Sequence, residues 1–132
     1  MAAEWECYLE KALECLRSAQ ISQSQNPKMC NCAANRSYYA AYLAELAALQ
    51  KLDPLKLPDQ GWRHPTVVHA FNFRLVRKAK IFKAAVIEDV SYLESQRIKG
   101  DYQAEHVSEA DAVECYRRAN RVVEAVRRAL EK

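Results

Sequence analysis

Apolar residues recur at steps of three and four along most of the chain, the spacing of one face of an α-helix. In the first stretch the recurring positions are Trp5, Leu9, Ala12, Leu16 and Ala19. They predict an amphipathic helix over 3–24. The second stretch is apolar on nearly every side, with Arg36 and Glu45 as its only charged residues between positions 33 and 50. We therefore expect a central helix over 32–51.

The second half of the chain predicts two or three more helices. Pro65 suits the first turn of a helix, because its missing N–H has no partner there in any case, and a bend is expected around 78–81. A helix over 82–96 follows, and Gly100 is expected to end it. Ser108-Glu109-Ala110-Asp111 has the spacing of a capping box, so the last helix begins at 108.

These elements predict an all-α protein. We expect a single domain over 1–132, built as a four- to five-helix bundle with a long loop near 52–64 and a short one near 98–107. A length of 132 residues is enough for one hydrophobic core.

The composition excludes several classes of protein. The chain has two Gly and four Pro, whereas average usage gives about 15 for this length. Glycine-rich phosphate loops, dinucleotide-binding turns and many-stranded sandwiches need these residues at close intervals. No apolar run approaches the roughly 18 residues of a membrane span, and the first residues are acidic, unlike a signal peptide. We expect a cytoplasmic protein with no membrane partner.

The ligand-forming residues predict neither a metal nor another cofactor. Five Cys, an odd number, give no disulfide or zinc framework, and the pair Cys30-x-Cys32 has no second pair to match it. A di-metal carboxylate bundle needs Glu-x-x-His on its helices, and none of His64, His69 and His106 has Glu three residues earlier.

Positive charge is concentrated in one segment. Positions 61–87 contain no acidic residue and six cations: Arg63, Arg74, Arg77, Lys78, Lys80 and Lys83. On a helix, the cations from Arg74 onward cover most of one side, an arrangement that follows the phosphates of a nucleic acid. Arg74, Arg77 and Lys78 are therefore candidate RNA-binding residues. A solvated face, or a surface for an acidic partner protein, explains the same charges.

Three passages resemble the HEPN superfamily, the higher eukaryote and prokaryote nucleotide-binding domain. The run from Ala34 to Tyr42 contains Asn-Arg-Ser-Tyr-Tyr-Ala-Ala-Tyr and resembles the family's "(S/N)RxYYAxF" second helix. Arg97-x-x-x-Asp101-Tyr102 resembles the "R…ADY" element of a bacterial branch, and His64-Pro65 with Ala70-Phe71 resembles the start of its third helix. The resemblance covers about 5–130.

The resemblance implies a helical bundle that dimerises. Many members are metal-independent ribonucleases with an Arg-x(4–6)-His pair, in which Arg steadies the phosphate and His handles the proton of the 2′-hydroxyl. Several are toxins or defence effectors, encoded beside a nucleotidyltransferase that neutralises them. Others only bind nucleotides or support a partner enzyme.

This chain departs from the catalytic pattern. The positions after Arg97 where His should stand hold Tyr102, Gln103 and Ala104, and the next His is His106. Arg97, Tyr102 and His106 are the candidate catalytic residues. An Arg-x5-His pair, Arg63 and His69, also exists, but at the start of the third helix.

The remaining candidates surround Arg36. A guanidinium on a buried helix needs a partner or a cleft, because burying it unpaired costs several kcal/mol. One interpretation is an internal Arg36–Asp101 ion pair that holds the loop before the last helix against the second helix. The other is an anion site lined by Arg36, Arg97 and Tyr102 and oriented by Asp101, with Tyr39 on the same helix side and His64 near the cleft.

Two functions remain open. The first is a domain that binds RNA or a nucleotide, as one half of a toxin–antitoxin or defence pair. It cleaves RNA if one of its residues can transfer the proton of the 2′-hydroxyl. The second is a non-catalytic module whose basic segment docks on an acidic partner, such as a nucleotidyltransferase.

Overall fold

The computed structural model describes residues 3–53 and 64–131, with the side chains of His64 and Pro65 left undescribed. The described residues form helices and no strand. The elements are α1 (Glu4–Ser24), α2 (Cys30–Leu52), α3 (His64–Ala70), the π-helix η1 (Phe71–Lys78), α4 (Ala85–Tyr102) and α5 (Glu109–Leu130). The expected all-α bundle is confirmed.

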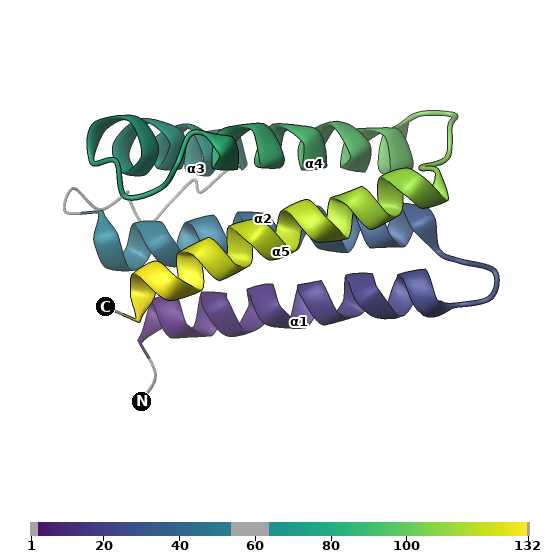
Figure 1. Ribbon diagram of the computed structural model, residues 1–132, viewed down its shortest axis with the longest axis horizontal. Helices are drawn as coiled ribbons and strands as arrows, with labels where there is room; N and C mark the ends of the chain where they lie inside the picture. Colours follow the sequence, from purple (N-terminus) through teal and green to yellow (C-terminus); the bar gives the residue numbers. More distant parts are fainter. Residues whose placement is uncertain (1–2, 54–63, 132) are drawn as a thin grey trace.

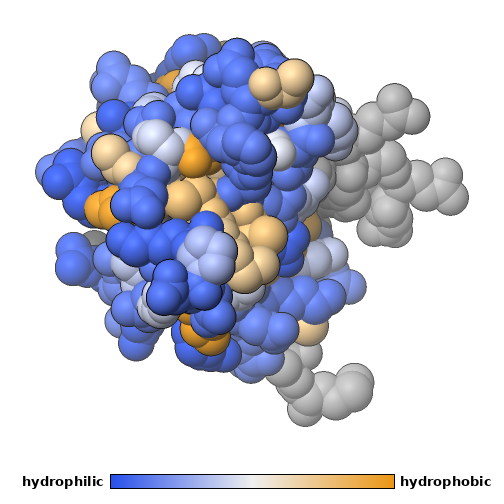
Figure 2. Space-filling view, turned by 90° about the vertical axis from the view of Figure 1, so that its right-hand side faces the viewer, coloured by the Kyte–Doolittle hydropathy of each residue, from blue (hydrophilic) through white to orange (hydrophobic). Residues whose placement is uncertain are grey.

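The long helices run alternately up and down the bundle. In Figure 1, α2 lies between α1 on one side and α4 on the other, and α5 crosses in front of it. The α1–α2 and α4–α5 connections meet at one end, which we call the near end because it faces the viewer in Figure 2. The connection between η1 and α4 lies at the opposite, far end.

The central position predicted for α2 is confirmed. Its seven alanines from Ala33 to Ala48 are all fully buried, which lets neighbouring helices approach closely. The largest fully buried side chains come from α2 and the elements around it: Tyr38, Leu49, Phe71, Leu75 and Leu93. The nearly all-apolar sequence of α2 follows from this position, because it packs against α1, α4 and α5 at once.

Two predicted helix ends are confirmed. The Ser108 side chain accepts a hydrogen bond from the backbone N–H of Asp111 at 3.0 Å, so it caps α5. The third helical stretch ends at Lys78, inside the expected range 78–81. There the N–H groups of Ile81 and Phe82 both donate to the Leu75 carbonyl, and Lys80 has φ of 56°.

The prediction that Gly100 ends its helix is wrong. The helix α4 begins at Ala85 and continues through Gly100 to Tyr102, so the connection to α5 is shorter than the predicted 98–107. A Cβ at Gly100 would lie 3.3 Å from both Asn31 Oδ1 and Val107 Cγ2. Gly100 therefore serves close packing, which offsets the roughly 0.5–1 kcal/mol that Gly costs within a helix.

Candidate functional site

The near end of the bundle holds most of the residues that the resemblance singled out. We define the tyrosine–arginine cluster as the side chains of Asn35, Arg36, Tyr38 and Tyr39 on α2 and Arg97, Asp101 and Tyr102 on α4. Positions 35 and 101 face each other because α2 and α4 run antiparallel, and residues three or four apart on each helix share a face.

Asn35 links the two helices. Its Nδ2 donates to Asp101 Oδ2 at 2.9 Å, and its Oδ1 accepts from Arg36 Nε at 2.9 Å and from Arg36 Nη2 at 2.6 Å. The expected direct Arg36–Asp101 ion pair is not among the ion pairs of the described residues, and Asp101 lies in the last turn of α4 instead of a loop. The amide of Asn35 connects the two charges in its place.

Arg97 is enclosed by aromatic rings. Its guanidinium carbon lies 4.6 Å from the ring centroid of Tyr38, 5.8 Å from that of Tyr102 and 5.9 Å from that of Tyr39. The side chain is only 11% exposed, and its contact with Asp101 is 3.8 Å, longer than a hydrogen bond. Its Nε is buried and has no acceptor in the described part of the chain. The guanidinium therefore has unused hydrogen-bond donors.

The tyrosines differ in their exposure. Tyr38 and Tyr42 are buried in the core, and burial raises the pKa of the Tyr38 hydroxyl far above its usual range. Tyr39 is half-buried, with the Arg36 guanidinium 5.4 Å from its ring centroid. Tyr102 is 75% exposed. Of the three rings in the cluster, Tyr102 is the one that a base could stack on from solvent.

A pocket opens beside the cluster. It has a volume of about 450 Å³, and Asn35, Arg36 and Asp101 line it together with Ser18 and Ser22 of α1. Pockets that hold small ligands start at about 300 Å³. The lining combines a cation, a carboxylate and small polar groups, which matches the phosphate and the hydroxyl groups of a nucleotide.

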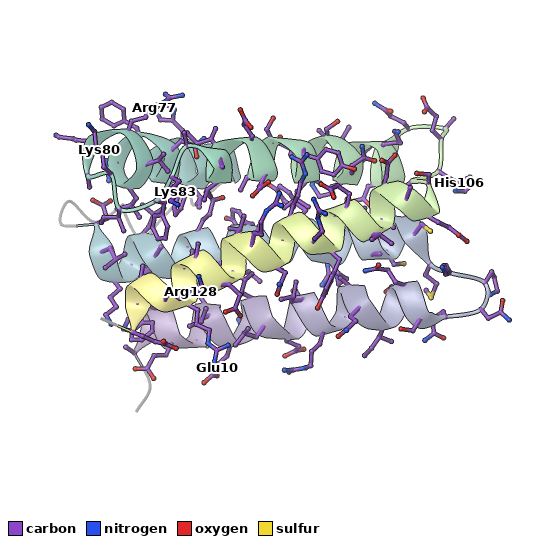
Figure 3. All side chains as sticks on the ribbon, in the orientation of Figure 1. Glu10, Arg77, Lys80, Lys83, His106 and Arg128 are labelled. Carbon is purple, nitrogen blue, oxygen red and sulfur yellow. The ribbon has the colours of Figure 1, made fainter. Side chains whose placement is uncertain are left out.

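His106 lies at the same end of the bundle, in the connection between α4 and α5 (Figure 3). Asn31 Oδ1 accepts the Val107 N–H at 2.9 Å, which leaves Asn31 Nδ2 as the donor to His106 Nδ1 at 3.0 Å. Because Nδ1 accepts this hydrogen bond, the proton of the neutral ring is on Nε2. His106 thus ties its connection to the start of α2.

The predicted RNA-binding cations do not share one surface. Arg74 Nη1 lies 2.6 Å from Oδ2 of the buried Asp53, so this arginine is part of an internal ion pair. Arg77 and Lys78 are exposed at the far end, where Figure 3 also places Lys80 and Lys83. They lie away from the tyrosine–arginine cluster because η1 and the start of α4 are at the end of the bundle opposite to Tyr102.

Two of the candidates from the sequence, His64 and the pair Arg63 and His69, are only partly described by the structure. His64 begins α3, but its side chain is not described. His69 stacks on Phe73 with ring centroids 6.4 Å apart, and its sequence partner Arg63 lies outside the described residues.

Glu45 is a buried acidic residue that was not among the candidates from the sequence. Its side chain is fully buried, and neither carboxylate oxygen has a hydrogen-bond partner in the described part of the chain. Burial, and secondarily the charge of Glu94, raises the pKa of this carboxyl well above its usual range. The signal was present in the sequence, since Glu45 is the only acidic residue within the apolar run of α2.

All five cysteines have free thiols in the structure. Cys115 is fully buried, and burial raises the pKa of its thiol to about 12. Within residues 3–53 and 64–131, no group of three or more metal-binding side chains is placed to hold an ion. None of the described helices has the length and apolar character needed to cross a membrane.

The model of the HEPN domain family matches residues 5–129. No curated protein matches the sequence.

Proposed function

Because the chain belongs to the HEPN family, we propose that it binds RNA or a nucleotide, with the tyrosine–arginine cluster as its phosphate site. One observation carries this proposal. Arg97 is only 11% exposed, yet its guanidinium has one ionic contact at 3.8 Å and a buried Nε without an acceptor among the described residues. A phosphate accepts paired N–H bonds from such a guanidinium, and the low exposure strengthens that interaction.

The neighbouring residues supply the other contacts of a nucleotide. Arg36 reaches the adjacent pocket of about 450 Å³, where it is a second cation for a phosphate. Tyr102, 75% exposed and 5.8 Å from the Arg97 guanidinium, offers its ring to a base. Asp101 contacts Arg97 and Asn35 and orients both side chains.

The hydrogen bond of His106 favours binding over cleavage. Cleavage requires a base that takes the proton of the 2′-hydroxyl as its oxygen attacks the adjacent phosphorus and the 5′-oxygen leaves. His106 Nδ1 is already hydrogen-bonded to Asn31, which ties this histidine to the start of α2. We therefore propose binding without cleavage, and a ribonuclease that uses Arg97, Tyr102 and His106 is the alternative.

We also propose the biological setting that the resemblance implies. The domain is one half of a toxin–antitoxin or defence pair in the cytoplasm, and its partner is a nucleotidyltransferase. The alternative is a HEPN module that only supports such a partner and has no nucleic-acid ligand. Arg77 and Lys78, exposed at the end away from the cluster, favour a second binding surface in either case.

A homodimer is the third element of the proposal. Figure 2 shows an apolar area surrounded by hydrophilic residues on the near end of the bundle. Ile21 and Met29 are 59% and 48% exposed there, next to the two pockets that share Met29, Asn31 and Cys32. We expect Met29→Glu to convert a dimer into a monomer in size-exclusion chromatography with light scattering; an unchanged mass contradicts a dimer through this face.

The binding proposal is tested with a fluorescent single-stranded oligoribonucleotide at low salt. Arg97→Gln should weaken binding by about tenfold or more, because it removes a charge-assisted contact worth about 1.5–3 kcal/mol. Tyr102→Ala should weaken it by about fivefold or more through lost stacking. Arg128→Gln is the matched control: Arg128 is exposed on α5 and lies far from the near end (Figure 3).

The outcomes separate the alternatives. Equal losses in Arg97→Gln and Arg128→Gln would mean that RNA binds by general charge attraction and not at the cluster. No binding by the unaltered protein leaves only the partner-supporting module. Cleavage products that depend on both Arg97 and His106 would replace the binding function with a ribonuclease.

A further inference from the structure

The far end of the bundle contains a hollow that the proposed function does not use. It lies between the last turn of η1, the turn at 79–84 and the first turn of α4, and its volume is about 800 Å³. The buried side chains of Val76 and Phe82 and the half-buried Ile87 form its floor. The exposed side chains of Arg77, Lys80 and Lys83 form its rim. We call this feature the cationic hollow.

The three rim cations are unpaired. Among the residues that the structure describes, Arg77, Lys80 and Lys83 make no ion pair, whereas Arg74 in η1 is paired with Asp53 at 2.6 Å. Glu88 is the one acidic residue that lines the hollow. Three cations around an apolar floor therefore attract an acidic partner that also presents an apolar side chain.

The backbone that builds the hollow is unusual in two ways. The segment Phe71–Lys78 is a π-helix, and the Ala79 N–H continues its pattern by donating to the Arg74 carbonyl at 3.0 Å. Short π-helical segments are often found at functional sites. Lys80 has φ of 56°, in the left-handed region, where a side chain other than that of Gly is strained. Backbone strain of this kind clusters at functional sites, so the turn that carries the rim is a candidate for one.

The lining of the hollow favours a protein over RNA. Its apolar residues are aliphatic except for Phe82, which is only 6% exposed, so the floor offers no exposed ring for a base. Aliphatic hollows of this kind accept the large apolar side chains of an amphipathic helix, which lie on one face at steps of three and four.

The acidic face of α1 in a second copy does not supply such a helix. The acidic residues Glu4, Glu6 and Glu10 are exposed on α1, but Trp5 and Leu9 between them pack on the core of their own subunit. Val113 is 53% exposed one turn after the exposed Glu109 on α5, so a second copy bound through α5 is the alternative occupant.

We propose that the cationic hollow docks an acidic amphipathic helix of another protein, with one large apolar side chain of that helix seated on the floor. This surface lies at the opposite end of the bundle from the tyrosine–arginine cluster, so the inference does not depend on RNA binding there.

The experiment uses the full chain and synthetic peptides of about four helical turns. The first peptide carries Leu at steps of three and four on one face and Glu on the flanks. The second has the same composition with the Leu residues spread around the helix. We expect the first to bind at least about tenfold more tightly in fluorescence anisotropy, because one well-seated side chain is worth about 1.5 kcal/mol or more.

Variants of the protein locate the contact. Ala84 is exposed and lines the hollow, so Ala84→Phe fills it without changing any charge and should weaken peptide binding about tenfold. Lys83→Glu should weaken it to a similar degree. Lys11→Glu, which reverses a charge on the exposed face of α1, is the matched control and should change it less than about twofold.

Three results overturn the proposal. The first is equal affinity of the two peptides. The second is unchanged peptide affinity in Ala84→Phe when its helical content and melting temperature are also unchanged. The third is displacement of the peptide by a single-stranded oligoribonucleotide whose own binding is weakened by the same variants. The last result makes the hollow a nucleic-acid surface. Loss of RNA binding in Arg97→Gln with unchanged peptide binding supports both proposals separately.

Discussion

Arg97 and Arg77 show how differently the two ends of this bundle use the same side chain. Arg97 is 11% exposed, lies against three tyrosine rings and has a buried Nε without an acceptor among the described residues. Arg77 is exposed beside an apolar hollow. An enclosed guanidinium can recognise a small anion by geometry, because its donors are fixed in direction. An exposed one attracts a large charged surface, and salt screens that attraction.

Arg74 marks the boundary between these two uses. It belongs to the basic segment in the sequence, but its guanidinium is paired with the buried carboxylate of Asp53 at 2.6 Å. Among the described cations of the basic segment, Arg74 is therefore structural, whereas Arg77, Lys78, Lys80 and Lys83 make no ion pair. The comparison predicts that stability depends on Arg74 and not on Arg77.

Asp53→Asn has the largest expected effect. It removes the charge partner of Arg74, and breaking a buried pair costs about 3–5 kcal/mol; partial exposure of Arg74, at 27%, puts the expected loss near the lower value, about 3 kcal/mol. Arg77→Ala, the control, should change stability by less than about 0.5 kcal/mol. Urea unfolding measures both. Equal losses in the two variants would remove the distinction between structural and free cations.

Glu45→Gln has the next largest expected effect, and it depends on pH. Burial raises the pKa of Glu45 in the folded protein, whereas in the unfolded chain the carboxyl has its ordinary pKa. As pH rises through the ordinary value, the unfolded state gains charge and the folded state does not, so this group lowers stability with rising pH. The variant should therefore be more stable by about 2 kcal/mol near neutral pH, on the scale of one buried carboxyl.

The gain in Glu45→Gln should vanish as pH falls to the ordinary glutamate range, because Glu45 then carries its proton in both states. Thermal melting across this range tests the sign. Glu10→Gln, at an exposed position of α1 (Figure 3), should show no such dependence. A gain that is constant with pH would mean that the Glu45 carboxyl has the same pKa in the folded and the unfolded protein.

Arg97→Met has a smaller expected effect on stability and sharpens the comparison. A buried Nε without an acceptor is unfavourable, and an apolar side chain of similar length removes that penalty while still covering the Tyr38 ring. We expect a gain of about 1 kcal/mol in the free energy of unfolding, together with the loss of RNA binding. A loss of stability would show that Arg97 is kept for the cation–π contacts instead of for a ligand.

The sequence predicted the parts of the fold that depend on neighbouring residues. The apolar run identified α2 as central, and Ser108 identified the start of α5 through a hydrogen bond to a backbone three residues away. The continuation of α4 through Gly100 could not be predicted, because the packing around this glycine comes from Asn31 and Val107. Local propensity favours an end there, and tertiary packing outweighs it.

The candidate site was predictable as a set of residues but not as a geometry. The motif spacing brought Arg36, Tyr39, Arg97, Asp101 and Tyr102 into one hypothesis, and these residues do lie together. The bridge through Asn35 depends on one side-chain orientation, and the Arg74–Asp53 pair joins positions 21 residues apart. Neither contact follows a periodic pattern in the sequence, so neither can be predicted from it.

Lys80→Gly has the smallest expected effect on stability. It tests whether the strained residue at position 80 contributes to peptide binding. The left-handed conformation at φ of 56° costs a lysine about 1–2 kcal/mol, and Gly avoids this cost but loses about 0.5–1 kcal/mol more in backbone entropy on folding. The net gain should be about 0.5 kcal/mol, or roughly 2 °C in melting temperature. The same substitution removes a rim cation of the cationic hollow, so peptide affinity should fall while RNA affinity at the opposite end stays unchanged. A variant that melts higher and binds the acidic peptide as tightly as before would show that the charge at position 80 has no part in docking.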